Sequence, residues 1–277
     1  ATRSSWREMG TVPNTRHGLL DGCRATVTVP GESGAISVHC SVRWVWWWQQ
    51  PNAPENGAMT QAVIFDLDGT LTNTEAVWDE ERRALMAREG LEWSEADSRA
   101  TMGMSTPDWS GYTHRSVGFG DNPDDAARRT IDAMLQRYSR DLPVLPGAAD
   151  AVRRMAEVWP LGVASSSPRV LIERALQVLG VRELFTVVRS TEEGTAKGKP
   201  APDAFLWVAE QLGADPAHTV VVEDSANGIM AGVNAGMPVI AIPPHFLPPS
   251  ADVLARAAEV LDDLAGLTVD LVRRVGG

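Results

Sequence analysis

Short, continuously apolar runs recur along the chain after residue 58, and they constrain its fold more than any other feature. Five of them are expected to be strands: 62–65, 160–164, 185–188, 219–222 and 238–242. Apolar runs rich in Val, Ile and Leu, without polar alternation, are typical of parallel strands buried on both faces. Segments with helical periodicity follow the later runs, at 169–179, 203–212, 226–235 and 251–259. This alternation predicts an α/β fold with a doubly wound, mostly parallel sheet.

The stretch between the first two predicted strands has a different pattern. Residues 75–145 contain no strand pattern, and helical spacing covers 75–89, 94–101 and 123–140. An all-helical insertion directly after a strand that ends in acidic residues suggests a cap that closes over a substrate and excludes water. We therefore expect a core domain built from 59–74 and 146–277, with a helical cap domain at 75–145.

Residues 1–58 differ in composition from the rest of the chain. They hold Cys23 and Cys40, the two cysteines, and five of the ten tryptophans, but no Lys, Phe or Tyr. A linker-like Pro- and Asn-containing stretch then leads to Met59. We interpret the segment as a non-native or unstructured N-terminal extension; a tryptophan-rich arm that binds a partner is the alternative. In a reducing compartment the two cysteines are expected to be free thiols.

The net charge of −11 limits the classes of partner. A nucleic acid or an anionic membrane would require a basic face, so neither is expected as a partner. No apolar run is long enough for a membrane-spanning helix, and no signal-peptide pattern opens the chain, so a cytoplasmic location is expected. A monomer is the default expectation, because a cap inserted in the same chain can complete the active site.

The stretch FDLDGTLTNT, which begins at Phe65, places two acidic residues where a strand ends. Asp66 and Asp68 are two residues apart, and Gly69 permits a tight turn directly after them. Open α/β sheets bind ligands at the carboxyl ends of their strands. Two carboxylates this close repel each other unless a cation joins them, so we expect a divalent metal with oxygen ligands, Mg²⁺. The alternative is a hairpin turn that carries a solvated acid.

Three further strand ends carry polar residues, each with an unremarkable alternative explanation. Ser165 follows the second strand and could donate to a phosphoryl oxygen, or simply cap the next helix. Lys199 lies in a Pro-stiffened loop, and Lys197 is the one other lysine among the 25 basic residues; a solvated surface lysine is the alternative. Glu223 and Asp224 follow the fourth strand as a second acidic pair, or as helix-capping acids.

These four signatures, in this order, resemble the haloacid dehalogenase superfamily of phosphohydrolases and phosphomutases, from Met59 to the C-terminal region. The resemblance implies a Rossmann-like core, an inserted helical cap, Mg²⁺ dependence and an aspartyl-phosphate intermediate. It implies that Asp66 is the nucleophile and that Asp68 protonates the leaving alcohol and later activates water. Ser165 and Lys199 would hold the transferring phosphoryl group.

The same resemblance implies a set of metal ligands. Asp224 would bind Mg²⁺ together with the carboxylate of Asp66 and the backbone carbonyl of Asp68, and Glu223 would be a direct or water-mediated ligand. An acid at position 68 argues against a true dehalogenase, whose chemistry needs neither that acid nor a metal.

The sequence looks most like the subgroup of β-phosphoglucomutase and bacterial sugar phosphatases, including those for 2-deoxyglucose 6-phosphate and hexitol phosphates. TEAVWDEERRALMAREG, LPGAADAV, GVASSSP and KPAPDAF carry this resemblance. The mutase pattern has a histidine where this chain has Trp78, and a cap arginine where it has Thr106. We therefore expect a Mg²⁺-dependent phosphomonoester hydrolase acting on a small sugar or polyol phosphate. A phosphomutase is the first alternative and a non-catalytic phosphate-binding or regulatory protein the second.

The expected substrate contacts come from both sides of the site. Ser165 and Ser166 are expected on the core side, with Gly103 and Thr106 in the cap loop. Trp109 lies at the end of this loop and Trp78 in the predicted helix 75–89, and for each of them packing in the cap core is the favoured interpretation. Arg115 is one candidate for contact with an acidic group of the substrate; a solvated surface arginine is the alternative.

Overall fold

The computed structural model describes residues 59–101, 104–194, 197–245 and 248–277. The predicted N-terminal extension and Gly103 of the predicted cap loop lie outside the described residues. None of the helices in these ranges combines the length and the apolar character that crossing a bilayer requires.

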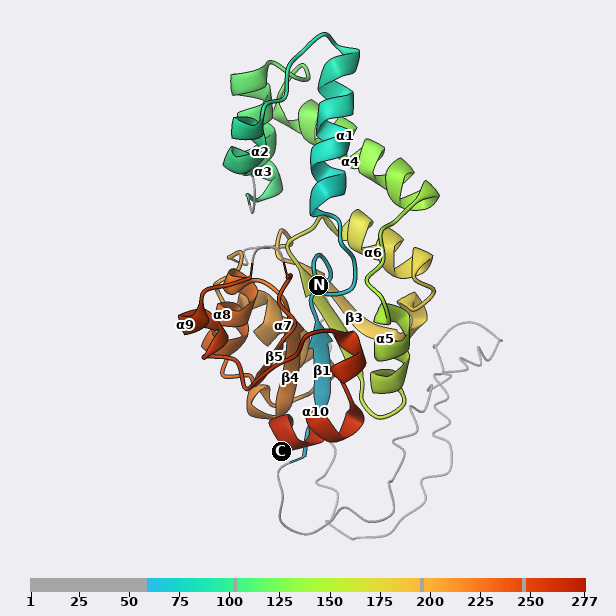
Figure 1. The fold of residues 1–277 in the computed structure, drawn as a ribbon, viewed down its shortest axis with the longest axis vertical. Helices are drawn as coiled ribbons and strands as arrows, with labels where there is room; N and C mark the ends of the chain where they lie inside the picture. Colours follow the sequence, from blue (N-terminus) through green and yellow to red (C-terminus); the bar gives the residue numbers. More distant parts are fainter. Residues whose placement is uncertain (1–58, 102–103, 195–196, 246–247) are drawn as a thin grey trace, which may run out of the picture. The chain divides into compact units, whose positions relative to one another are not determined.

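A six-stranded parallel sheet forms the centre of the fold, in the order β3-β2-β1-β4-β5-β6 (Figure 1). Its strands are β1 (Ala62–Phe65), β2 (Leu161–Ser165), β3 (Phe185–Ser190), β4 (Thr219–Glu223), β5 (Val239–Ala241) and β6 (Glu259–Val260). The chain starts in the middle, adds β2 and β3 on one side of β1, and then crosses to β4 on the other side. The predicted doubly wound α/β fold is confirmed.

Helices cover both faces of this sheet, which explains why its strands show no polar alternation. Along β1, Val63 and Phe65 point into a core shared with α5 (Ala148–Ala156), α6 (Arg169–Val178) and α10 (Val269–Gly276). Between them, Ile64 points into the opposite core, shared with α7 (Asp203–Leu212) and α8 (Ala226–Asn234). All three strand residues are completely buried.

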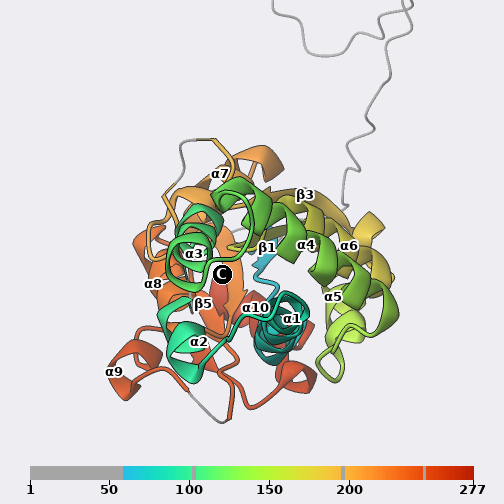
Figure 2. The same ribbon diagram turned by 90° about the horizontal axis from the view of Figure 1, so that it is seen from above.

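Between β1 and β2 the chain leaves the sheet and forms a helical segment, residues 75–145. Its elements are α1 (Glu75–Arg88), α2 (Glu95–Thr101), α3 (Thr106–Tyr112), the π-helix η1 (Thr113–Val117) and α4 (Pro123–Arg140). A small core of its own joins α1, α4 and the loops that follow α1 and η1, and it includes Met86, Trp93 and Phe119. Figure 2, seen from above, shows the segment lying over one end of the sheet. There α4 lies beside α6, and Arg174 of α6 donates to the Ser139 hydroxyl at 2.9 Å.

Predicted and observed elements differ most near the C-terminus. The helix expected over 251–259 ends early, as α9 (Ala251–Leu254), and Glu259 instead begins the two-residue strand β6. Residues Ile240 and Glu259 pair in parallel register at the edge of the sheet. A strand of two residues carries no readable periodicity, because its pairing depends on a neighbour far away in sequence. The sequence also did not predict helices α3 and α5. Nor did it predict three short 3₁₀ turns, η2 (Arg182–Leu184), η3 (Pro216–His218) and η4 (Leu264–Gly266).

Candidate active site

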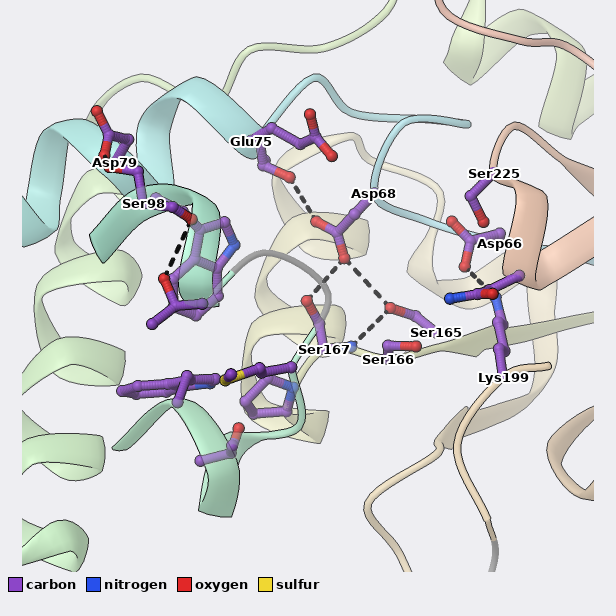
Figure 3. A pocket seen from close by; sticks show the side chains of 18 of the residues that line it. Asp66, Asp68, Glu75, Asp79, Ser98, Ser165, Ser166, Ser167, Lys199 and Ser225 are labelled. Carbon is purple, nitrogen blue, oxygen red and sulfur yellow. Dashed lines mark hydrogen bonds and ion pairs between the residues drawn. The ribbon is translucent and has the colours of Figure 1, made fainter. Parts of the chain in front are cut away.

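Parallel pairing brings the predicted polar strand ends together. Phe65 of β1 pairs with Val163 of β2 on one side and with Val222 of β4 on the other. The residues that follow these positions therefore emerge at the same edge of the sheet. Figure 3 shows Asp66, Asp68, Ser165 and Lys199 around one pocket at this edge.

Lys199 forms the centre of a buried ion-pair cluster. Its ammonium contacts Oδ1 of Asp66 and lies 2.6 Å from Oε1 of Glu223. The three side chains are only 5%, 8% and 1% exposed, for Lys199, Asp66 and Glu223 respectively. Burial alone would lower the pKa of Lys199, but the two carboxylates outweigh it and hold that pKa above its ordinary value. The lysine is therefore a permanent positive charge beside Asp66.

One lysine does not balance the acidic residues around it. Carboxylate oxygens of Asp66, Glu223 and Asp224 lie within 4.8 Å of one another. Burial raises the pKa of Asp66 to about 8, and repulsion from Glu223 adds to this effect while Lys199 opposes it. Burial, with repulsion from Glu223 and Asp66, likewise raises the pKa of Asp224 to about 9. The site holds more buried negative charge than its protein groups neutralise.

Hydrogen bonds show which of these carboxylates could hold a cation. Glu223 uses Oε1 for Lys199 and Oε2 for the backbone N–H groups of Asp224 and Ser225, so both of its oxygens already accept hydrogen bonds. Within the described residues, the Oδ2 atoms of Asp66 and Asp224 accept no hydrogen bond. Two carboxylate oxygens without partners, in a cluster with excess negative charge, fit a divalent cation with oxygen ligands.

The turn after β1 is shaped around Asp224. Gly69 has a φ of +96°, a conformation that favours glycine, and a Cβ added there would lie less than 3.0 Å from the Asp224 carboxylate. Thr70, the next residue, donates its hydroxyl to Oδ1 of Asp224 at 3.2 Å. The glycine predicted to permit a tight turn therefore also leaves room for the acidic side chain that follows β4.

Asp68 lies in a separate network of hydroxyl groups (Figure 3). Its Oδ1 accepts from the Thr74 hydroxyl at 2.5 Å, and its Oδ2 accepts from the hydroxyls of Ser165 at 3.2 Å and Ser167 at 2.7 Å. Thr74 is the residue before α1, so the carboxylate is held between the start of the helical segment and the end of β2. This places an oriented acid beside the nucleophile candidate without a direct bond to Lys199.

The three serines after β2 differ in their contacts. The hydroxyl of buried Ser165 donates to Asp68 and accepts from the backbone N–H of Ser167. Ser166 is exposed, and like the other two it lines the pocket. Helix α6 begins two residues after Ser167, so its first backbone N–H groups lie close to this turn. The turn can therefore present hydroxyl and amide donors to an anion.

A cavity of about 410 Å³ extends from these groups toward the helical segment. This is the size of a site for a small organic molecule. The lining residues from Thr74 and the helical segment after it are Thr74, Glu75, Trp78, Asp79, Arg82, Ser98, Thr101, Met104, Thr106 and Trp109. The cavity is therefore closed on one side by the sheet edge and on the other by α1, α2 and α3.

Three of the residues considered for the cap side of the site line the cavity, and Arg115 does not. Thr106 lines the cavity, and its backbone N–H donates to Oε1 of Glu192 at 2.8 Å across to the core. Trp78 and Trp109 pack edge to face at 6.0 Å and also line the cavity, so they both pack in the segment and face the site. Arg115 is exposed and is not among the residues that line the cavity, which fits the alternative of a solvated surface arginine.

Sequence reasoning missed three residues of this site. Ser167 and Thr74 donate to Asp68, although both stand in polar runs, SSSP and TNT, that were already recognised as site motifs. Arg82 lines the cavity from α1. It lies one turn after Trp78 on the apolar face of the helix, and a charged residue at an apolar position was the available signal.

Known proteins with similar sequences include phosphatases. The family model described as "haloacid dehalogenase-like hydrolase" matches residues 60–236. Hexitol phosphatase B of Escherichia coli is 32% identical over 66% of this chain and 83% of its own length. The bifunctional riboflavin kinase/FMN phosphatase of Arabidopsis thaliana is 31% identical over 76% of this chain, but the match spans only 55% of that longer protein.

Two solved structures that align with this chain contain bound phosphate. CbbY from Rhodobacter sphaeroides, crystallised with phosphate, aligns with a TM-score of 0.66 and 25% identity over 76% of this chain and 96% of its own. A "HAD family hydrolase" from Deinococcus radiodurans, with bound phosphate and sodium, aligns with a TM-score of 0.56 and 29% identity over 78% of this chain and 96% of its own. Both alignments extend over nearly the whole of the solved chains.

Proposed function

Because the chain belongs to the haloacid dehalogenase-like hydrolases, we propose that it is a Mg²⁺-dependent phosphomonoester hydrolase that acts on a small sugar or polyol phosphate. One observation carries this proposal. The carboxylates of Asp66 and Asp68 border the same cavity, one paired with a buried lysine and the other held by hydroxyl groups. Two nearby carboxyl groups in different environments can divide the roles of nucleophile and acid–base catalyst. The relation to hexitol phosphatase B favours the sugar or polyol class.

In the first step, Asp66 attacks the phosphorus atom of the substrate. A bond forms between a carboxylate oxygen and phosphorus, and the bond from phosphorus to the substrate oxygen breaks. Asp68 in its protonated form gives its proton to the leaving alkoxide, so that a neutral alcohol departs. Lys199 stabilises the charge on the transferring oxygens, and the Ser165 hydroxyl can turn from Asp68 to donate to one of them.

In the second step, water attacks the aspartyl phosphate. Asp68, now deprotonated, accepts a proton from this water as its oxygen bonds to phosphorus, and the bond between phosphorus and Asp66 breaks. Inorganic phosphate leaves, and both carboxyl groups return to their starting states. The hydrogen bonds from Thr74 and Ser167 support these roles because they hold the Asp68 carboxylate in one orientation.

The carboxylates of Asp66 and Asp224, with the backbone carbonyl of Asp68, would hold the magnesium ion. Bound there, the ion supplies positive charge that offsets the nucleophile and the phosphate oxygens. Glu223 would position Lys199. Toward the metal it would act through a bridging water, because both of its oxygens already accept hydrogen bonds.

Residues 75–145 are proposed to act as a cap domain on the core formed by 59–74 and 146–277. The cavity wall supports this role, because eight of the 20 residues that line it lie on helices α1 to α3. Closure of such a segment over the substrate would keep bulk water away from the reacting groups until the alcohol has left.

The proposal is tested by measuring release of inorganic phosphate by the full chain with Mg²⁺. The panel contains hexose, deoxyhexose and hexitol phosphates and β-glucose 1-phosphate, with Asp66→Asn as the inactive control. We expect phosphate from at least one sugar or hexitol phosphate and none above background from the variant. Conversion of β-glucose 1-phosphate to glucose 6-phosphate without phosphate release would favour the mutase instead, and no reaction with any ester would favour a binding protein.

A further inference from the structure

A buried arginine without an acidic partner lines the cavity on its helical side. Arg82 of α1 is only 8% exposed and is part of the cavity wall. Among the described residues, no carboxylate lies within salt-bridge distance of its guanidinium, although other arginines of α1 and α4 form such pairs. Burial lowers the pKa of Arg82 to about 10, with only partial compensation from Asp79. An unpaired buried charge is costly and calls for an explanation.

Most of the hydrogen-bonding capacity of this guanidinium is unused. Arginine has five N–H donors. In the described part of the protein, one hydrogen bond is present, from the NH1 group to the Thr101 hydroxyl at 3.3 Å, and Nε is buried without a partner. The nearest acid on the same helix, Asp79, already accepts hydrogen bonds from Arg83, Trp93 and Ser98. It is therefore not available to Arg82.

Three indole rings surround the charge. The guanidinium carbon lies 5.0 Å from the ring centre of Trp78, 5.6 Å from Trp93 and 5.1 Å from Trp109. Such cation–π contacts stabilise a buried cation and fix the plane of the guanidinium. They offer no acceptor oxygen, so the N–H groups stay available to a ligand in the cavity.

A second polar atom in the same wall lacks a partner. The hydroxyl oxygen of Thr106, which starts α3, is buried and makes no hydrogen bond within the described residues. Thr106 lines the cavity together with Arg82. Two independent buried donors without acceptors, from different helices, point to a ligand that brings the acceptors with it.

We propose that Arg82 and Thr106 form a distal subsite that binds an anionic oxygen group, a carboxylate or a second phosphate, at the end of the substrate remote from the transferred phosphate. This inference rests on the proposed function, because it deepens the substrate class of the same cavity. The preferred substrates are then acidic sugar or polyol phosphates rather than neutral ones.

The placement of Arg82 on α1 suits this role. The hydroxyl of Thr74, at the start of the helix, donates a hydrogen bond to Asp68. Arg82 lies eight residues after Thr74, or about 12 Å along a helix axis. Side chains on a helix lean toward its N-terminus, so a long arginine side chain reaches back toward the phosphate end of the cavity. A chain of a few carbon atoms can span the remaining distance.

An anion explains the site better than a neutral hydroxyl group. A hydroxyl would satisfy some N–H groups but leave the buried charge uncompensated, whereas a carboxylate or phosphate supplies both acceptors and opposite charge. Planar guanidinium groups bind such anions through two parallel hydrogen bonds. The other acids in this wall do not reverse the preference, since Asp79 is engaged by Arg83 and Glu75 is exposed to solvent.

The test compares substrates that differ only at the distal group. In one pair, 6-phosphogluconate is set against sorbitol 6-phosphate, so that a carboxylate replaces a hydroxymethyl group on the same six-carbon chain. In the other, fructose 1,6-bisphosphate is set against fructose 6-phosphate. We expect kcat/KM of the full-length enzyme to favour the acidic member at least tenfold in one pair, and that pair identifies the anion.

Variants connect this preference to Arg82. Arg82→Met should lower the ratio of acidic to neutral kcat/KM at least tenfold, Arg82→Lys should lower it less, and Thr106→Val should lower it about threefold. Arg88→Met, on the exposed end of the same helix, is the control and should keep the wild-type ratio. If Arg82→Met does not fold, as judged by its melting temperature, Arg82→Lys decides. A wild-type ratio of one or less in both pairs, or equal losses on both substrates, would overturn the proposal.

Binding separates this inference from the proposed function. Calorimetric titration of Asp66→Asn with 6-phosphogluconate, fructose 1,6-bisphosphate and their neutral partners needs no turnover. Tighter binding of an acidic ligand, lost in Asp66→Asn/Arg82→Met, would support the distal subsite even if no ester were hydrolysed. Hydrolysis of neutral esters, with no preference for acidic ligands in binding or in kcat/KM, would leave the hydrolase standing and exclude the subsite.

Discussion

The carboxylate of Glu223 occupies the space that a side chain at Gly228 would need. A Cβ added to Gly228 would lie less than 3.0 Å from both carboxylate oxygens of Glu223. The carboxylate is completely buried, and it links Lys199 to the backbone N–H groups of Asp224 and Ser225. The position of Lys199 therefore depends on a glycine in the first turn of α8.

Replacing Gly228 with alanine should damage activity more than stability. The added methyl group forces the buried Glu223 carboxylate to move, and Lys199 loses one of its two acidic partners. We expect kcat/KM to fall at least a hundredfold, with a stability loss of about 1–3 kcal/mol as for other overpacked interiors. Phosphate release and chemical denaturation measure the two effects. A variant with wild-type activity would show that Glu223 does not hold the lysine.

Replacing Asp68 with asparagine should have an effect that depends on the leaving group. Asparagine has the same shape, and its oxygen can accept from the hydroxyl groups on one side while its NH2 group donates to the hydroxyl oxygens on the other. The fold should therefore persist, but asparagine cannot give a proton to the departing oxygen. p-Nitrophenol leaves readily without a proton, whereas a sugar alcohol does not. The loss in the rate of the first step should therefore be at least tenfold larger for a hexitol phosphate than for p-nitrophenyl phosphate.

Single-turnover measurement of alcohol release reports this first step directly, since the second step also needs Asp68. Ser166→Ala is a suitable comparison, because Ser166 lines the same cavity and makes no hydrogen bond to Asp68. Equal losses of Asp68→Asn on both esters would mean that Asp68 is not the general acid.

Strand ends were predictable from the sequence because their signals are local. A continuous apolar run identifies a buried strand, and parallel pairing guarantees that residues such as Asp66 and Ser165 emerge at one edge. Arg82 could not be placed in this way. Which part of the α1 face meets the cavity depends on how α1 packs against α4 and on where Trp109 of α3 comes to lie, and neither is a local property of the sequence.

The three serines after β2 also show that a local sequence pattern does not determine which side chains meet. GVASSSP indicates a polar turn before a helix, but the choice between Ser166 and Ser167 as the partner of Asp68 depends on the direction in which the turn leaves β2. Sequence reasoning placed Ser166 at the substrate and overlooked Ser167. Strand β6 was missed for a related reason, since its pairing partner lies in β5 and not in its own pattern.

Deletion of residues 1–58 should leave catalysis unchanged. All described residues that line the cavity lie between Asp66 and Asn227, and the sheet begins at Ala62. We expect the fragment that starts at Met59 to show the same kcat/KM as the full chain, within about twofold. Steady-state phosphate release by both proteins makes the comparison, and a large loss of turnover in the fragment would assign a function to the tryptophan-rich segment.

The stabilisation of the protein by Mg²⁺ should increase with pH. In the folded protein without a cation, the pKa is raised from 3.8 to about 8 for Asp66 and to about 9 for Asp224. Between the unfolded and folded values, the folded state keeps protons that the unfolded chain has released. Stability from these groups is thus complete below about pH 4 and declines as pH rises toward 9. A bound cation replaces the protons and removes this decline.

Melting temperatures of EDTA-treated protein, with and without Mg²⁺ at constant ionic strength, measure this linkage. The increase caused by Mg²⁺ should be small at about pH 6, where protons compete for the same oxygens, and several degrees larger at about pH 8.5. Asp224→Asn removes one ligand and should abolish most of the difference, whereas Asp270→Asn, on the exposed face of α10, should keep it. A Mg²⁺ effect that is independent of pH would mean that the ion binds elsewhere than at Asp66 and Asp224.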